Sequence, residues 1–226
     1  MLRKIHGWIK DYLHATYTHL HTIIIKEPPK HFLGHIITGK KPIILIPGYL
    51  EKWNFLSKIA NPLSHVGHPI YVVKNLGYNT NEVHFSAELI HELIRENSLK
   101  NIILISHSKG GLIGKYLLSF KNEDGAIEKL IAVATPWAGS HAAKLIPHKS
   151  AKELRPNSEI LEKLNIQSKV NHKIVSIYGI YDNHVWPTKS CYLDGAKNIE
   201  VDTYGHHTIL FGNDVVKIIE KEVEAI

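Results

Sequence analysis

Six short runs of consecutive apolar residues alternate along the chain with segments of helical periodicity. Most of these runs are rich in isoleucine and valine and show no alternation of polar and apolar positions, which is typical of strands buried on both faces. Alternation of such strands with helices favours a parallel sheet. We therefore predict a three-layer α/β/α sandwich with a mostly parallel sheet of about six strands. The predicted strands cover residues 43–46, 70–73, 102–105, 130–134, 173–178 and 198–201, and the predicted helices between and after them cover residues 53–66, 82–96, 110–120 and 214–224.

The length and composition fit one globular domain. A chain of 226 residues can form a single core. The composition, with 44% hydrophobic and 21% charged residues, excludes the disordered classes. The net charge of +6 comes without a basic run that contains interleaved aromatic residues, so we expect no nucleic-acid partner. The single cysteine, Cys191, excludes an intrachain disulfide and is expected to be a structural thiol.

Residues 1–30 are predicted to form an N-terminal amphipathic helix that precedes a globular domain of residues 31–226. Apolar residues recur in it at spacings of three and four. The helix either packs on the domain or lies at a membrane interface, with Trp8 at headgroup level and Arg3 and Lys4 facing lipid phosphates. Lys10 and Asp11 interrupt any signal-peptide core, so we expect a cytoplasmic protein, with peripheral membrane contact as a hypothesis.

The third predicted strand leads into Ser106-His107-Ser108-Lys109-Gly110, which has the form of a nucleophile elbow. The usual pattern is G-x-S-x-G, and here the small residue Ser106 replaces the first glycine. Small residues are needed because the turn brings the strand and helix backbones together. The alternative is a glycine-rich helix start that binds a phosphate, but the P-loop pattern is absent. The position after a buried strand favours Ser108 as a nucleophile.

A serine nucleophile needs a base, and the base needs an orienting acid. In a parallel sheet, active-site residues follow the carboxyl ends of the strands. Asp182 follows the fifth strand, whereas the rival acid Asp202 lies on the sixth strand, so we prefer Asp182. His206 and His207 follow the sixth strand, and position alone does not choose between them. These residues occur in the order serine, acid, histidine.

An oxyanion hole needs backbone donors. We predict the N–H group of Lys109, directly after the nucleophile, and the N–H group of Tyr49, in the loop that follows the first strand. Gly48 permits the turn that this loop requires. The alternative for Pro47-Gly48 is an ordinary turn.

Residues 42–224 resemble the α/β-hydrolase lipases, especially the minimal bacterial lipases of the lipase A type. The resemblance is carried by three C-terminal segments and by a Thr-Pro-x-x-Gly-Ser segment after the fourth strand. In those lipases the matching positions hold the triad Asp and His, which implies Asp182 and His206. The chain departs from them in having Pro47 where they have a His. The four segments are Ser176-Ile177-Tyr178, Leu193-Asp194-Gly195-Ala196-Lys197-Asn198, Gly205-His206-His207-Thr208-Ile209-Leu210 and Thr135-Pro136-Trp137-Ala138-Gly139-Ser140.

The expected reaction is hydrolysis of a carboxylic ester, including lipid esters, through an acyl-enzyme on Ser108, with no metal and no organic cofactor. Residues 141–165 are a candidate cap over the site. Two alternatives stay open: an acyltransferase that uses the same triad, and a non-catalytic binding module with the same fold.

Overall fold

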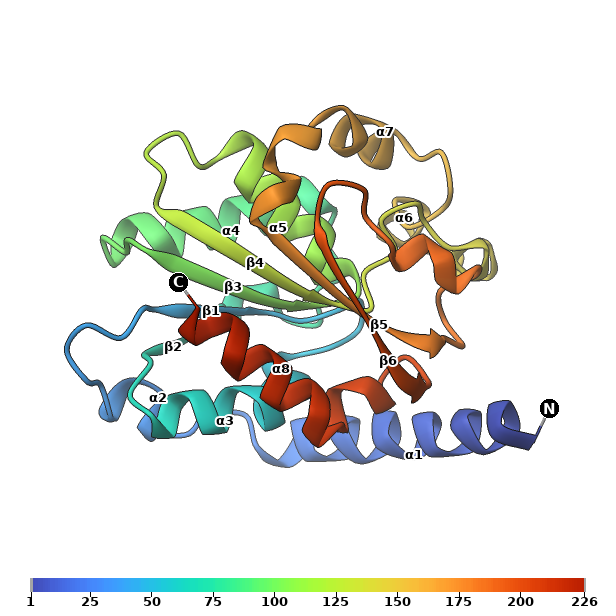
Figure 1. Cartoon of the computed structure of the whole chain (residues 1–226), viewed down its shortest axis with the longest axis horizontal. Helices are drawn as coiled ribbons and strands as arrows, with labels where there is room; N and C mark the ends of the chain where they lie inside the picture. The colour runs from blue at the N-terminus through green and yellow to red at the C-terminus, as the bar shows by residue number, and fades with distance from the viewer. Residues whose placement is uncertain (1, 226) are drawn as a thin grey trace.

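The computed structural model describes residues 2–225 and contains one six-stranded sheet with helices on both faces (Figure 1). The strand order is β2-β1-β3-β4-β5-β6, and every neighbouring pair is parallel. The predicted three-layer sandwich around six parallel strands is confirmed. The strands are β1 (Ile43–Ile46), β2 (Ile70–Val72), β3 (Ile102–His107), β4 (Ile127–Val133), β5 (Ile174–Tyr181) and β6 (Lys197–Tyr204).

The helices divide between the two faces of the sheet. In Figure 1, α1, α2, α3 and α8 lie on one side of the sheet, and α4 and α5 lie on the other with α7 beyond them. The predicted helix 53–66 is two elements, a 3-10 turn at Trp53–Leu56 followed by α3. The helices are α1 (Leu2–Ile24), α2 (His31–Gly34), α3 (Ser57–His65), α4 (Val83–Glu96), α5 (Lys109–Phe120), α6 (Lys149–Lys152), α7 (Glu159–Ile166) and α8 (Asn213–Glu224).

The central strands β1 and β3 bury both of their faces, as their uninterrupted apolar composition predicts. In β1, Ile44 and Ile46 join the hydrophobic cluster that includes α4 and α5, whereas Ile43 and Leu45 join the cluster that includes α3 and α8. All four side chains are completely buried. Side chains alternate between the two faces of a strand, so a strand covered on both sides must be apolar at every position.

Helix α1 packs on the domain through its polar face. Its buried residues are Gly7, Asp11, Thr18 and Thr22, which recur on one side of the helix. Gly7 is required there because a Cβ atom would lie 2.6 Å from the Cβ atom of Tyr204 in β6. The structure ends this helix at Ile24, before the predicted residue 30, and its packed face is opposite to the apolar stripe.

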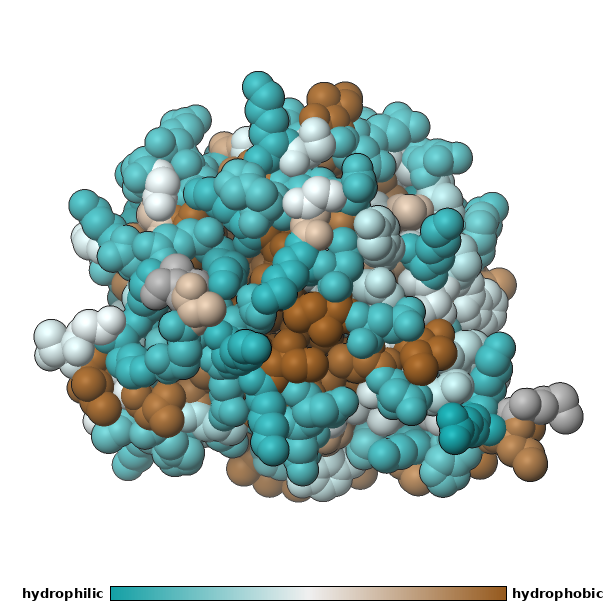
Figure 2. Space-filling model, in the orientation of Figure 1, coloured by the Kyte–Doolittle hydropathy of each residue, from teal (hydrophilic) through white to brown (hydrophobic). Residues whose placement is uncertain are grey.

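The apolar stripe of α1 is therefore exposed. Figure 2 shows apolar side chains along the lower edge of the molecule, where Figure 1 places α1. None of the helices among residues 2–225 has the length and hydropathy needed to cross a bilayer. We call the exposed side chains the apolar face of α1; they are Leu2, Ile5, Trp8, Ile9, Tyr12, Leu13, Tyr17, Leu20, Ile23 and Ile24.

Candidate active site

Ser108 lies at a sharp turn between β3 and α5. Its φ of 51° and ψ of −123° are outside the ordinary regions for a residue with a side chain. A Cβ atom at Gly110 would lie 2.2 Å from the carbonyl oxygen of Ile46, so only glycine allows α5 to approach β1 this closely. The hydroxyl of Thr135 donates to the carbonyl oxygen of Ser108 at 2.9 Å and holds the turn from the other side.

Asp182 and His206 form a buried pair beyond the ends of β5 and β6. The distance between His206 Nδ1 and Asp182 Oδ2 is 2.7 Å. The second carboxylate oxygen accepts the backbone N–H groups of His184 at 2.7 Å and Val185 at 2.8 Å. Burial alone would raise the pKa of Asp182, but His206 and these two donors hold it below its usual value. Asp182 is therefore an ionised acceptor for an imidazole N–H.

A cavity of about 370 Å³ contains both Ser108 and His206 in its lining. This volume is in the range of small-molecule sites. Tyr49 lines the same cavity, while Lys109 begins α5 directly after Ser108. The structure thus brings the predicted nucleophile, base and oxyanion loop to one cavity and places Asp182 behind the base. The apolar residues that line this cavity are Ala15, Leu50, Pro136, Ala142, Ala143, Ile146, Leu154 and Val185.

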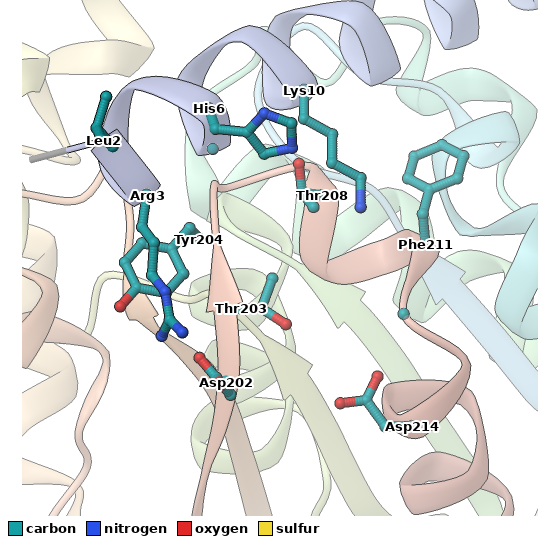
Figure 3. A pocket seen from close by; sticks show the side chains of 12 residues that line it. Leu2, Arg3, His6, Lys10, Asp202, Thr203, Tyr204, Thr208, Phe211 and Asp214 are labelled. Carbon is teal, nitrogen blue, oxygen red and sulfur yellow. The ribbon is translucent and has the colours of Figure 1, made fainter.

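The rival acid Asp202 lines a different cavity. That cavity has a volume of about 580 Å³ and lies between α1, β6 and the start of α8 (Figure 3). Its lining combines basic side chains such as Arg3 and Lys10 with the carboxylates of Asp202 and Asp214. Neither Ser108 nor His206 is among the residues that line it. This placement favours Asp182 over Asp202 as the partner of His206.

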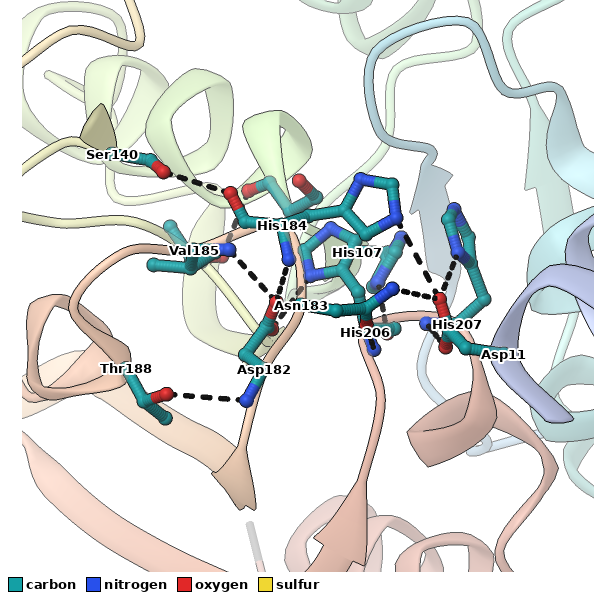
Figure 4. A network of polar contacts seen from close by, with 12 residues as sticks. Asp11, His107, Ser140, Asp182, Asn183, His184, Val185, Thr188, His206 and His207 are labelled. Carbon is teal, nitrogen blue, oxygen red and sulfur yellow. Dashed lines mark hydrogen bonds and ion pairs between the residues drawn. The ribbon is translucent and has the colours of Figure 1, made fainter. Parts of the chain in front are cut away.

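The carboxylate of Asp11 enters the site from α1 and is completely buried (Figure 4). Its Oδ1 accepts the backbone N–H groups of His207 at 2.6 Å and Thr208 at 2.8 Å. Its Oδ2 accepts the side-chain amide of Asn183 at 3.0 Å and lies 3.1 Å from His207 Nδ1. The Asn183 carbonyl oxygen in turn accepts the backbone N–H of His206 at 2.9 Å. Asp11 therefore connects α1 to the backbone on both sides of His206.

Glu51 connects the loop after β1 to the same region. Its Oε2 accepts the backbone N–H of Gly48 at 2.7 Å, and its Oε1 lies 2.8 Å from His107 Nδ1 and 3.4 Å from His207 Nε2. The other ring nitrogen of His107 lies 3.0 Å from the carbonyl oxygen of His206. Glu51 thereby joins the predicted oxyanion loop, the elbow strand and the histidine loop.

His207 lies between two carboxylates and is itself buried. Burial alone would lower the pKa of His207, but Asp11 and Glu51 raise it from 6.5 to about 10. The ring is therefore an imidazolium at neutral pH, and each of its nitrogens has a carboxylate acceptor. His184, by contrast, has its pKa lowered to about 3 by burial and by the charges of His206 and His207, so it is neutral.

Asp11, His184 and His207 offer three ligand atoms that lie within 4.8 Å of one another, a grouping that could hold a metal ion. Each oxygen of Asp11, however, already accepts hydrogen bonds from two donors. We therefore describe the group as a hydrogen-bonded charge network. The sequence-based expectation for this site is that it contains no metal.

Sequence reasoning missed Asp11, Glu51, His107 and Asn183. Three of them lie beside predicted strand ends, so the rule that selected Asp182 and His206 could also have found them. Asp11 had no such signal, because a carboxylate on the polar side of an amphipathic helix is usually solvated.

The side chain of Lys109 links the elbow to the candidate cap. Its Nζ donates to the carbonyl oxygen of Asn79 at 3.0 Å and to the hydroxyl of Ser150 in α6 at 3.3 Å. Burial lowers the pKa of Lys109 to about 8. The segment 141–165 contributes Ala142, Ala143 and other cavity-lining residues, so it forms one wall of the site.

Solved structures resemble the chain across most of its length. The mature form of Bacillus licheniformis lipase BlEst2 superposes with a TM-score of 0.67 and 16% identity, covering 87% of this chain and 96% of that chain. A monoacylglycerol lipase of Paleococcus ferrophilus gives a TM-score of 0.62 with 13% identity and covers 84% of this chain and 96% of that chain. The chain has the α/β-hydrolase fold.

Two sequence comparisons agree with this fold. The model of the family described as lecithin:cholesterol acyltransferase matches residues 75–153 of this chain, which include the elbow. Lysosomal thioesterase PPT2-B of Xenopus laevis is 30% identical over 118 residues, which are 49% of this chain and 41% of that protein. The match therefore spans about two fifths of the relative's length.

Proposed function

We propose that this α/β-hydrolase cleaves carboxylic esters through an acyl-enzyme on Ser108, with His206 as general base and Asp182 as its orienting acid. The observation that carries the proposal is the 2.7 Å contact between His206 and Asp182 beside a cavity that Ser108 also lines. The lipases with similar folds and the thioesterase with a similar sequence support hydrolysis of an acyl group.

In the proposed mechanism, Ser108 Oγ attacks the ester carbonyl carbon while His206 Nε2 takes the hydroxyl proton. Asp182 keeps the other ring proton on Nδ1 and stabilises the imidazolium. Collapse of the tetrahedral intermediate breaks the bond to the alcohol, which receives the proton from His206. Water then attacks the acyl-enzyme by the same route, releasing the acid and regenerating Ser108.

The backbone N–H groups of Tyr49 and Lys109 are the proposed oxyanion donors. Lys109 N–H is at the first turn of α5, where the helix dipole also favours negative charge. Tyr49 follows Gly48, whose own N–H is engaged by Glu51 at 2.7 Å. That bond supports a fixed loop, which electrostatic stabilisation of a transition state requires.

The decisive experiment measures hydrolysis of p-nitrophenyl esters from acetate to palmitate by the wild type and by Ser108→Ala. We expect the wild type to be active and Ser108→Ala to lose at least about 10⁴-fold in kcat. A fluorophosphonate should label the wild type at Ser108 and leave Ser108→Ala unlabelled. A folded wild type that neither hydrolyses any of these esters nor reacts with the fluorophosphonate would contradict the proposal and favour a non-catalytic binding module.

Lipid esters presented at a membrane surface are the proposed substrate class. Ala15 and Thr16 of α1 line the cavity, and Tyr12 both lines it and is 51% exposed on the apolar face of α1. Leu50 lines the cavity from the opposite loop and is 47% exposed. Arg3, Lys4 and other basic residues flank the helix and complement anionic headgroups. A lipid in contact with α1 would therefore lie beside the cavity entrance.

Cosedimentation with phosphatidylcholine/phosphatidylglycerol vesicles tests this membrane contact. The double variant Leu13→Ser/Leu20→Ser removes two side chains that are 65% and 57% exposed. We expect it to lose about 10-fold in vesicle binding and in activity on emulsified long-chain esters, with unchanged activity on soluble p-nitrophenyl acetate. The control is Ile166→Ser, which alters an apolar residue of α7 that is 79% exposed. Equal vesicle binding by wild type and double variant would contradict the membrane contact.

Acyl transfer to an alcohol is a second candidate, favoured by the match of residues 75–153 to the lecithin:cholesterol acyltransferase family. The acyl-enzyme is the same, and an alcohol replaces water in the second step. Product analysis with added acceptor alcohols distinguishes the two reactions. An ester product in excess of free acid supports transfer, and free acid alone supports hydrolysis.

A further inference from the structure

We propose that Asp11 of α1 and Glu51 of the loop after β1 are positioning residues. Acting through His207 between them, they hold His206 and the oxyanion loop in fixed positions relative to each other. This inference rests on the proposed function, because it assigns these groups a part in the work of Ser108 and His206. It also makes α1 a component of the active site.

The network holds both backbone polar groups of His206. Asn183 accepts its N–H at 2.9 Å, and Asn183 is itself bound to Asp11 at 3.0 Å. The carbonyl oxygen of His206 lies 3.0 Å from His107 Nε2, and His107 is bound to Glu51 at 2.8 Å. The peptide groups on either side of the proposed base are therefore each connected to a buried carboxylate (Figure 4).

Burying the charges of Asp11 and Glu51 costs free energy. Asp11 is 0% exposed and Glu51 is 2% exposed, so both carboxylates have lost their hydration. A buried ion pair usually contributes little net stability compared with well-packed apolar side chains. A carboxylate on the packed face of a surface helix therefore contributes little to the free energy of packing that helix on the domain. Every bond of Asp11 to another element reaches the loops that carry Asn183 and His206 to Thr208.

The ring of His207 lies between the carboxylates of Asp11 and Glu51. Its Nδ1 lies 3.1 Å from Asp11 Oδ2, and its Nε2 lies 3.4 Å from Glu51 Oε1. One imidazolium thus connects α1 to the oxyanion loop, and its ring is 5.2 Å from the ring of His206 in an edge-on arrangement. Loss of either carboxylate should therefore also change the position of the segment that carries the other carboxylate.

The test compares Asp11→Asn and Glu51→Gln with the wild type, using a soluble ester so that membrane contact plays no part. Each amide keeps the size of the acid. Its N–H group, however, points at donors from which the carboxylate accepted hydrogen bonds. We expect kcat to fall 10- to 100-fold with KM changed less than about threefold, and the rate of fluorophosphonate labelling of Ser108 to fall in parallel. The double variant should lose less than the product of the two single losses, because both act through His207.

The matched control is Thr22→Ala. Thr22 is another buried polar residue on the packed face of α1, and its hydroxyl bonds only within the helix, to the carbonyl oxygen of Thr18 at 2.9 Å. We expect it to retain wild-type kcat. A loss in Thr22→Ala equal to that in Asp11→Asn would show that general loosening of α1 is responsible, and would overturn the proposal.

The pH profile provides a readout that loosening of α1 alone would not produce. Asp11→Asn removes one of the two carboxylates that keep His207 protonated. The alkaline fall in kcat should therefore begin at least one pH unit lower in this variant than in the wild type. The charged and titratable groups that face His207 are Asp11, His14 and His19 of α1, Glu51 of the oxyanion loop, His107 of β3, and His184 and His206 of the loops after β5 and β6.

The remaining outcomes are also decisive. Wild-type kcat in Asp11→Asn, together with loss of activity in Ser108→Ala, would overturn the positioning role and leave the proposed function intact. An inactive and unlabelled wild type would overturn both. If the variants fail to fold, ¹⁵N NMR of the wild-type histidines still tests the network. A His207 ring that keeps both protons above pH 8 supports it, and an ordinary titration near pH 6.5 overturns it.

Discussion

Single residues determine the geometry of the elbow. Ser108 has a positive φ of 51°, a conformation that costs a residue with a side chain roughly 1–3 kcal/mol and persists only where its surroundings impose it. The close contact between Gly110 and the carbonyl group of Ile46 is part of those surroundings. The strained turn places Ser108 in the lining of the cavity that His206 also lines.

Gly110→Ala should be strongly destabilising. Its Cβ would lie 2.2 Å from a backbone oxygen, which cannot move as a flexible side chain can. We expect a loss of at least about 2 kcal/mol in the free energy of unfolding, measured with urea. Gly34→Ala is the control, because nothing lies within 4 Å of its added Cβ, and its effect should stay below about 0.5 kcal/mol. Equal stability of the two variants would contradict the close approach.

Asp182→Asn should lower kcat by about 10³- to 10⁴-fold, because an amide cannot hold the imidazole in the tautomer that accepts the serine proton. Steady-state kinetics on a soluble p-nitrophenyl ester checks this. The matched control is Asp202→Asn, since Asp202 lines the separate cavity beside α1. A larger loss of kcat in Asp202→Asn than in Asp182→Asn would reverse the assignment of the acid.

Secondary-structure elements contribute to the site in two ways. Helix α1 supplies a buried carboxylate on one face and an apolar surface on the other. The segment 141–165 supplies a wall of the cavity and is tied to α5 through Lys109 and Ser150. Both elements lie outside the sheet. Substitutions in them can therefore change the lining of the cavity without altering the strand ends.

Lys109→Met should loosen α6 without removing the proposed oxyanion donor, which is a backbone group. Loss of the bond to Ser150 leaves the cap with fewer attachments to α5. We expect amide hydrogen exchange in residues 149–152 to accelerate by about 10-fold, with exchange in α8 unchanged. The control is Lys152→Met, which alters an exposed lysine of the same helix. Unchanged exchange in Lys109→Met would contradict this link.

For the whole molecule, the buried charges make stability depend on pH. The pKa of His207 is raised from 6.5 to about 10, so its contribution is complete below pH 6.5 and is lost as the pH rises toward 10. The pKa values of Asp11, Glu51 and Asp182 are lowered, so their contributions are lost as the pH falls below about 4. Lys109 and Lys115, with pKa values lowered to about 8, become less destabilising as the pH rises above 8.

His207→Gln isolates the histidine contribution from that of the lysines. The free energy of unfolding, measured with urea between pH 5 and pH 10, should fall more steeply in the wild type than in the variant between pH 6.5 and pH 10. The difference between the two curves should change by at most about 5 kcal/mol over that interval. Parallel curves for wild type and variant would show that His207 titrates normally.

Much of this protein could be predicted from the sequence because the signals are local. Uninterrupted runs such as Ile102–Ile105 can only be strands buried on both faces, and their alternation with helices implies a parallel sheet. In such a sheet the strand ends converge at one edge. Position therefore selected Ser108 and Asp182, and the resemblance to lipases selected His206 over His207. The structure places Ser108 and His206 at one cavity and Asp182 2.7 Å from His206.

Only the tertiary structure decided which face of α1 packs and what Asp11 contacts. A helical period reveals two faces, and the hydrophobic effect predicts that the apolar one is buried. Here the polar face is buried, because Gly7 permits close contact with Tyr204 and because Asp11 meets donors from Asn183, His207 and Thr208. Those partners lie more than 170 residues along the chain. No local pattern encodes a hydrogen bond between such distant segments, since it exists only after the sheet has brought them together.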